Sequence, residues 1–82
     1  MPIWRIQTCK QHSGYRSNAS IYKLISDGLW TKPVLIGRRS VGWPSEEVEE
    51  INRARIAGLS DAKIRELVRI LHQKRVELLK LI

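Results

Sequence analysis

The 82-residue sequence predicts a mostly helical fold with one small β-hairpin. Apolar residues recur at helical spacing in several segments, a short apolar strand with an Arg-Arg turn stands among them, and glycines mark the boundaries. A chain of this length has room for one domain with a small core. We expect residues 1–58 to form the body of that single domain and residues 59–82 to add a long C-terminal helix.

The segment from Gln7 to Ser26 is expected to form two short helices that Gly14 separates. Ser17 or Asn18 can cap the second helix, because side-chain oxygens accept hydrogen bonds from the free N–H groups of a first turn. Positions 21, 24 and 25 are apolar and share one face of that helix. The opposite face is small, polar and basic, as a helix in a DNA groove requires. It consists of Ala19, Tyr22, Lys23 and Ser26.

The segment from Leu29 to Trp43 predicts a β-hairpin. Pro33 precedes an apolar strand at 34–36, residues 37–40 form the turn, and residues 41–43 return. Pro44 cannot donate to a strand pairing, so it ends the hairpin. It also suits the first position of the next helix, where its missing N–H has no cost.

Two further helices are expected, at 44–57 and from Asp61 to the C-terminus. In the first, Val48, Ile51 and Ile56 are expected to face inward, and its acidic start and basic end match the helix dipole. Ser60 is the expected N-cap of the second. That helix carries an apolar stripe of Ile64, Leu67, Val68, Leu71, Leu78, Leu79 and Ile82, widened by Ile70 and Leu81.

The C-terminal stripe has two interpretations. It can fold back onto the body and complete the core, or it can form a homodimer interface, since DNA-binding proteins often act as two-fold pairs. Arg75 near the centre of the stripe disfavours a long uninterrupted coiled coil. Both interpretations stay open.

Positive charge is concentrated in the N-terminal half of the chain. The net charge is +7, and residues 1–43 hold seven basic residues but only one acid, Asp27. Such a one-sided basic field attracts a polyanion. No apolar run is long enough to span a bilayer, and residues 1–5 lack the basic region and long apolar stretch expected of a secretory signal. A single cysteine, Cys9, excludes a disulfide framework. We expect a cytoplasmic protein with no membrane partner.

The basic helix and the hairpin together predict a winged helix-turn-helix that binds double-stranded DNA. We call the hairpin the wing. Base-edge or phosphate contacts are expected from Arg16, Asn18, Ser20 and Lys23. Phosphate contacts are expected from Ser17, Tyr22 and Ser26. Backbone or minor-groove contacts are expected from Lys32, Arg38, Arg39 and the tip residue Ser40.

Other chemistries are weakly supported. Trp4, Trp30 and Trp43 could stack on single-stranded bases, but Trp30 and Trp43 bracket the hairpin and are more simply explained by packing. Cys9, His12 and His72 are too few for a structural zinc site, which needs about four ligands. No nucleophile motif or glycine-rich phosphate loop is present, so we expect no catalytic residue, metal or cofactor.

Short runs over most of the chain resemble one known family. They are Gly14, Ser20–Ile25, Gly28–Trp30, Lys32–Val34, Ile36–Trp43 and Glu47–Val48, then Ala54–Gly58, Ser60–Asp61 and Ile64–Arg65. The stretch from Gly37 to Trp43, spaced after the Ser-Ile-Tyr helix, is the specific part. In this order the runs resemble the AlpA family of phage and prophage regulators, whose fold is similar to that of MerR-type regulators and excisionases.

The resemblance implies DNA binding at an integrated element, through the helix at 17–26 and the wing tip at 38–40, and hence a nucleoid-associated protein of the bacterial cytoplasm. A transcriptional regulator and an excisionase have the same sequence signature, so both roles stay open. An alternative is a protein-interaction adaptor that binds an integrase or RNA polymerase through the C-terminal helix.

Overall fold

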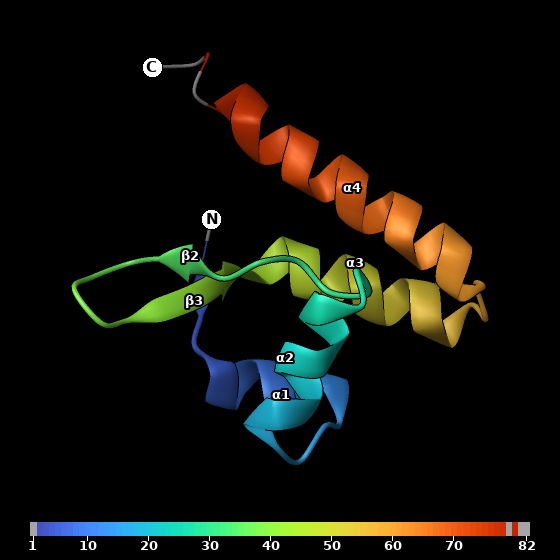
Figure 1. Cartoon of the computed structure of the whole chain (residues 1–82), viewed down its shortest axis with the longest axis horizontal. Coiled ribbons are helices and arrows are strands. Elements are labelled where there is room, and N and C mark those ends of the chain that lie inside the picture. Colours follow the sequence, from blue (N-terminus) through green and yellow to red (C-terminus); the bar gives the residue numbers. More distant parts are fainter. Residues whose placement is uncertain (1, 79, 81–82) are drawn as a thin grey trace.

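A computed structural model describes residues 2–78 and 80 of the chain. Within them, four helices and three short strands follow the order β1–α1–α2–β2–β3–α3–α4 (Figure 1). The strands are β1 (Ile3–Trp4), β2 (Val34–Leu35) and β3 (Val41–Pro44). The helices are α1 (Ile6–Ser13), α2 (Asn18–Ser26), α3 (Ser45–Ile56) and α4 (Asp61–Leu78). The predicted fold class, mostly helical with a small antiparallel hairpin in a winged helix-turn-helix, is confirmed.

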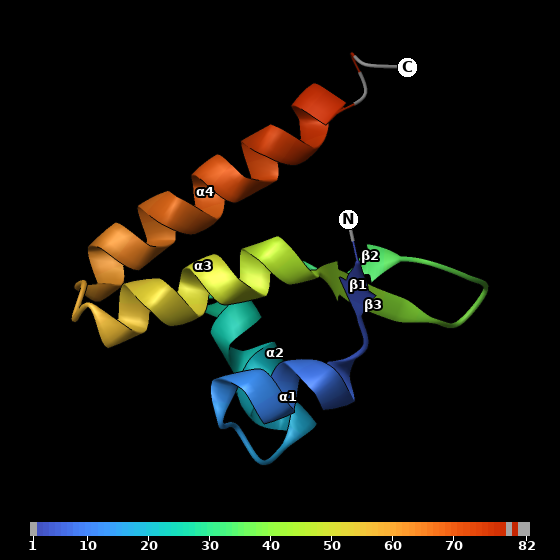
Figure 2. The same ribbon diagram turned by 180° about the vertical axis from the view of Figure 1, so that it is seen from behind.

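Helix α3 is the centre of the arrangement. It contacts α1 on one side and α4 on the other, and α2 packs beside α1 (Figures 1 and 2). The wing, formed by β2, β3 and the loop at 36–40, extends sideways from the body as its most projecting part. In Figure 1, α2 lies below α3 and the wing extends to the left, while α4 covers the opposite side of α3.

The helix ends follow the predicted caps. The Ser17 hydroxyl accepts a hydrogen bond from the Ser20 N–H at 3.2 Å, and the Ser60 hydroxyl accepts one from the Lys63 N–H at 3.3 Å. Gly14 ends α1 in the left-handed region, with φ of 82°, where a side chain would be strained. Of the two candidate caps for α2, Ser17 is thus the one in place.

The sheet contains a strand that the sequence pattern does not indicate. Strand β1 pairs antiparallel with β3, with Ile3 opposite Pro44 and Trp4 opposite Trp43, and gives the order β1–β3–β2. Gly42 permits this pairing, because a Cβ there would lie 2.6 Å from Cγ2 of Ile3 and 2.9 Å from the Trp4 carbonyl oxygen. A two-residue strand has too few positions to show an alternating pattern.

The expected position of Pro44 in α3 is wrong by one residue. Pro44 is the last residue of β3 and the N-cap of α3, with φ of −56° and ψ of 129°. The Ser45 N–H, the first of the helix, donates to the Pro2 carbonyl at 2.9 Å. The pairing with β1 therefore holds the proline in extended backbone and starts the helix at Ser45.

The core lies where the wing, α1, α2, α3 and the first half of α4 meet. Trp30 and Trp43 are almost fully buried in it, which agrees with their predicted packing role. The Trp43 indole Nε1–H donates to the Thr31 carbonyl at 2.8 Å. Cys9 is buried too, and burial raises the pKa of its thiol to about 11. Trp4 is half-buried and stacks on His12.

Two apolar positions differ from expectation. Ile56 is 87% exposed, and Ala54 is buried in its place, because residue 56 lies about 140° around α3 from the buried Ile51. On α4, positions 64, 68 and 71 are buried, whereas Leu78 is 46% exposed as the helix diverges from α3 (Figure 1). The stripe residues Leu79, Leu81 and Ile82 lie outside the described residues. The first half of the stripe therefore packs onto the body.

Candidate nucleic-acid interface

The outward face of α2 is open to solvent. Ile21 is buried and Leu24 and Ile25 pack against the core, so the helix is anchored by one side. The exposed residues on the other side are Ala19, Tyr22, Lys23 and Ser26. Side chains on this face are short except for Tyr22 and Lys23, so the backbone of α2 can approach a groove closely.

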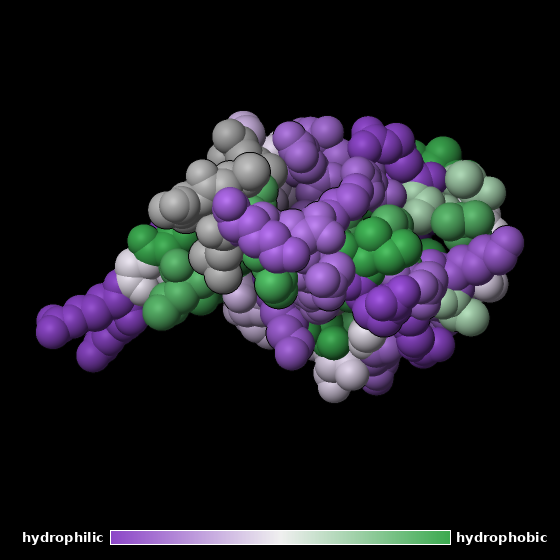
Figure 3. Space-filling model, turned by 90° about the horizontal axis from the view of Figure 1, so that it is seen from above, coloured by the Kyte–Doolittle hydropathy of each residue, from purple (hydrophilic) through white to green (hydrophobic). Residues whose placement is uncertain are grey.

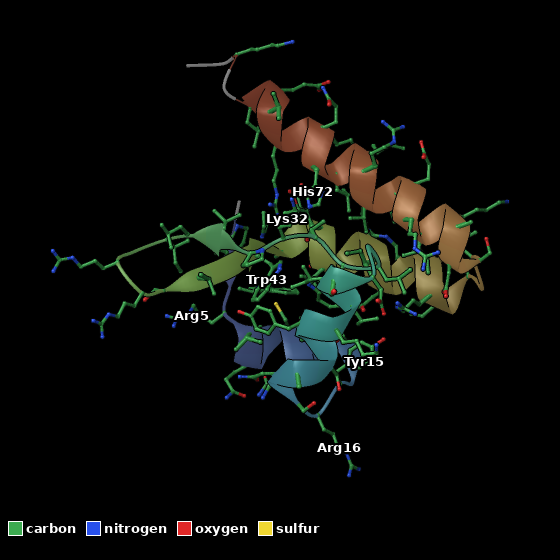
Figure 4. All side chains as sticks on the ribbon, viewed as in Figure 1. Arg5, Tyr15, Arg16, Lys32, Trp43 and His72 are labelled. Carbon is green, nitrogen blue, oxygen red and sulfur yellow. The ribbon has the colours of Figure 1, made fainter. Side chains whose placement is uncertain are left out.

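Ser17 and Ser20 make hydrogen bonds to each other at the start of α2. The two hydroxyl oxygens lie 2.8 Å apart, and Ser17 also caps the Ser20 N–H. Both hydroxyls therefore have a structural use in the free protein. Asn18 and Arg16 stand beside them and are exposed, and Arg16 points away from the body at the end of the α1–α2 loop (Figure 4).

Lys23 is held only loosely. Its ammonium lies 3.8 Å from the Asp27 carboxylate, and the side chains are 80% and 44% exposed. An exposed pair of this kind contributes little, since water and salt screen it. The ammonium of Lys23 is free to leave Asp27 for a nucleic-acid oxygen or nitrogen.

The wing tip carries two exposed guanidinium groups. Arg38 and Arg39 lie in the loop between β2 and β3, and the Ile36 N–H donates to the Ser40 carbonyl at 2.9 Å to close it. Figure 3, which looks onto the molecule from the α4 side, shows the end of the hairpin as a hydrophilic projection beyond a more apolar base. Guanidinium groups can bind phosphate oxygens with two hydrogen bonds each.

Lys32 is not brought together with the α2 residues. Its backbone N–H donates to Nε2 of His72 at 3.0 Å, and its carbonyl accepts from Nη2 of Arg75 at 2.8 Å. Figure 4 shows Lys32 beside His72, between the root of the wing and α4. Among the predicted contact residues, Lys32 therefore lies on the side of the wing that faces α4.

Arg5 is an exposed cation that no sequence pattern assigns to the interface. It follows Trp4, whose partner in the sheet is Trp43, and it precedes α1. Figure 4 shows it on the underside of the wing, between the wing and α1. Its position follows from the pairing of strand β1 with β3, and the two residues of β1 carry no periodic signal that would predict this pairing. Arg5 places a further exposed cation between the wing and α1.

Neither a membrane-spanning nor a metal-binding feature is found in the described part of the chain. No helix in residues 2–78 and 80 is long and apolar enough to cross a bilayer. Within the same residues, no three His, Cys, Asp or Glu side chains gather as a metal site would require.

These features define a small winged helix-turn-helix protein with an exposed α2 face and a basic wing. The chain belongs to the AlpA family of prophage regulatory proteins. The model of the family described as "Prophage CP4-57 regulatory protein (AlpA)" matches residues 3–56, from β1 to the end of α3. This confirms the resemblance found in the sequence. No curated protein and no solved structure shows significant similarity to the chain.

Proposed function

We propose that this protein is a sequence-specific double-stranded DNA-binding regulator of a prophage or integrative element. Helix α2 lies in the major groove, and the wing lies on the flanking backbone or in the minor groove. One observation carries the proposal: the polar face of α2 and the Arg38–Arg39 tip are both exposed, and the contact of Tyr22 with Trp43 links α2 to the base of the wing. Family membership supports the regulatory role.

The contacts divide by what each side chain can do. Lys23, Asn18 and Arg16 donate to base edges or phosphates at the α2 end, and Tyr22 and Ser26 donate to phosphates. Arg38, Arg39 and Arg5 are assigned to phosphates under the wing. Phosphate contacts fix the register of the protein, whereas base contacts carry the specificity.

The test is fluorescence anisotropy with duplexes from the genomic neighbourhood of the gene and with random duplex, at several salt concentrations. If about five or six phosphates are neutralised, log K falls against log salt with a slope of about −5. Selective, salt-dependent binding supports the proposal. A flat salt dependence, or equal affinity for all duplexes, contradicts it. A preference for single strands would favour the stacking alternative instead.

The finer role is a transcriptional regulator or an excisionase at the nucleoid. Both need this surface and neither needs a catalytic residue. A bend in the bound duplex, measured by circular-permutation mobility shift, supports excisionase activity, whereas promoter-dependent transcription without a bend supports regulation. A homodimer through α4 is a further proposal, supported by the exposed apolar side chains of Ile70, Val76 and Leu78. A footprint twice the length of one binding module supports the dimer.

A second candidate function is an adaptor for an integrase or RNA polymerase. A groove of about 430 Å³ lies between the start of α3 and the end of α4. Its lining is apolar and charged, with more acidic than basic residues, and consists of Pro44, Glu46, Glu47, Glu50, Leu71, Lys74, Arg75, Glu77 and Leu78. Glu46, Glu50 and Glu77 have no ion-pair partner among the described residues, so the groove suits a basic amphipathic helix.

Charge reversal tests the adaptor. Glu46→Lys with Glu50→Lys should weaken binding of the purified integrase of the element or of host RNA polymerase. Glu49→Lys, an exposed position on α3 outside the groove lining, is the matched control. Equal binding by the groove variant and the control would contradict the adaptor role.

A further inference from the structure

Helix α4 holds the wing at its root through both polar backbone atoms of one residue. The Lys32 N–H donates to Nε2 of His72 at 3.0 Å, and Nη2 of Arg75 donates to the Lys32 carbonyl at 2.8 Å. The partners lie about 40 positions apart in the sequence and come from the long helix that the family match does not include. We call Lys32, Glu47, His72 and Arg75 the clasp.

Arg75 is itself fixed in orientation. Its Nε lies 2.7 Å from Oε2 of Glu47, and its Nη2 lies 2.5 Å from Oε1 of the same carboxylate. The Glu47 residue is 6% exposed, so the pair is largely shielded from water. A two-point guanidinium–carboxylate pair is rigid. Arg75 therefore joins α3 to the Lys32 carbonyl as a fixed bridge.

His72 is held in one protonation state. Its Nε2 accepts a hydrogen bond, so that nitrogen carries no proton and the proton of the neutral ring is on Nδ1. Burial lowers the pKa of His72, and the charges of Arg75 and Lys32 lower it further. The negative charge of Glu47 acts in the opposite direction and raises it. The ring is therefore neutral and able to accept the Lys32 N–H at pH 7.

The outer strand of the wing has few other restraints. Within residues 2–78 and 80, strand β2 is an edge strand that pairs only with β3, through Val34 opposite Gly42 and Leu35 opposite Val41. Leu35 is 72% exposed and adds little packing. The tip at Arg38 is about 20 Å of extended chain beyond Lys32. A small change of angle at the root thus becomes a large displacement at the tip.

We propose that His72 and Arg75 are positioning residues for the wing, and that α4 sets the angle at which Arg38 and Arg39 meet the DNA backbone. The effect on DNA binding rests on the proposed function, but the restraint of the wing by α4 is present in the free protein. It gives α4 a role in DNA binding although no part of α4 is assigned to the interface.

The first experiment measures the free protein by NMR in wild type, His72→Leu and His72→Gln. His72→Leu removes the acceptor, and His72→Gln keeps a carbonyl oxygen in its place. The Lys32 amide should exchange about fivefold faster or more in His72→Leu, on the scale of one lost hydrogen bond. The heteronuclear NOE of residues 37–40 should fall as well, with partial recovery in His72→Gln. Gln73→Leu, an exposed neighbour on α4, is the control.

The second experiment measures affinity for a mixed-sequence DNA duplex of about two helical turns. His72→Leu should weaken binding about threefold to tenfold, but should have no further effect in a chain that already carries Arg38→Ala and Arg39→Ala, because its effect passes through the wing tip. Thermal melts ensure that each variant is folded at the temperature used.

The results separate the two proposals. An unchanged Lys32 amide and unchanged wing NOE in His72→Leu overturn the clasp, whatever the DNA affinity. Equal losses in the presence and absence of the tip arginines also overturn it, because a general effect on the fold would be additive. If wild type binds no duplex, the DNA-binding function fails, and the NMR result still decides whether α4 restrains the wing.

Discussion

Tyr22 of α2 packs edge-on against Trp43 of β3, with ring centroids 6.3 Å apart and ring planes inclined by 66°. Trp43 is fully buried, whereas Tyr22 is 45% exposed on the face assigned to DNA. The contact joins the helix proposed for the major groove to the base of the wing. Because aromatic pairs prefer this edge-on geometry, it fixes one element relative to the other.

Removal of the Trp43 ring should destabilise the fold. Trp43→Ala leaves a cavity beneath Tyr22 and loses the Nε1 hydrogen bond to the Thr31 carbonyl, so we expect a loss of about 3–5 kcal/mol. Trp43→Phe keeps most of the ring and should lose less. Urea denaturation measures both, and Leu35→Ala at an exposed wing position should change stability little. A Trp43→Ala chain as stable as wild type would contradict the buried placement.

Gly42 should tolerate no side chain. In Gly42→Ala the new methyl would meet Cγ2 of Ile3 and the Trp4 carbonyl, so the β1–β3 pairing must shift, at a cost of about 1–3 kcal/mol. Gly37→Ala is the matched control, because its nearest neighbour, Cβ of Ser40, is at an ordinary 3.6 Å. Thermal unfolding of the two variants makes the comparison. Equal melting temperatures would mean that β1 does not pair as described.

The wing-tip arginines should contribute affinity without specificity. Arg38→Ala with Arg39→Ala removes two phosphate contacts, so binding to all duplexes should weaken by a similar factor. The slope of log K against log salt should become shallower by about two. Titrations at several salt concentrations test this. A loss confined to one target sequence would show that the tip reads bases.

The clasp predicts a pH dependence of stability. The folded protein holds the pKa of His72 below its ordinary value of 6.5, so the unfolded chain binds the proton more readily. The contribution of His72 to stability is present above about pH 6.5 and is lost as the pH falls through the lower pKa of the folded state. The Lys32 N–H, the Arg75 guanidinium and the Glu47 carboxylate all face the ring.

Urea denaturation at about pH 7.5 and about pH 5.5 measures this loss. The wild type should lose more stability between the two pH values than His72→Gln, by up to about 1 kcal/mol, the net contribution of one hydrogen bond. Subtracting the loss in His72→Gln from the loss in wild type removes the contribution of every other group that titrates between the two pH values. Identical pH profiles for the two chains would contradict the assigned hydrogen bond.

The periodic part of the structure could be predicted from the sequence. The buried face of α2 follows directly from Ile21, Leu24 and Ile25 at helical spacing, and the serine caps and the Arg-Arg turn are local signals. Strand β1 could not be predicted, because two residues show no period. The apolar character of Ile56 predicts an inward position, but its angle on the helix, about 140° from Ile51, leaves it exposed.

The position of Lys32 also could not be predicted from the sequence. As a basic residue beside the wing, it has the same local signal as Arg38, yet its backbone is bound by His72 and Arg75. That contact depends on how α4 crosses α3 some 40 residues later, and local sequence carries no information about such a crossing. Arg5 is the converse case, since strand β1 brings it beneath the wing.

We propose that α2 reads the sequence of duplex DNA. The most direct test compares wild type and Lys23→Ala by fluorescence anisotropy, on the selected target duplex and on random duplex. Wild type should bind the target tightly and selectively, and Lys23→Ala should lose about 1–3 kcal/mol of binding free energy on the target, with a smaller loss on random duplex. Equal losses on both duplexes, or no selectivity in wild type, would contradict it.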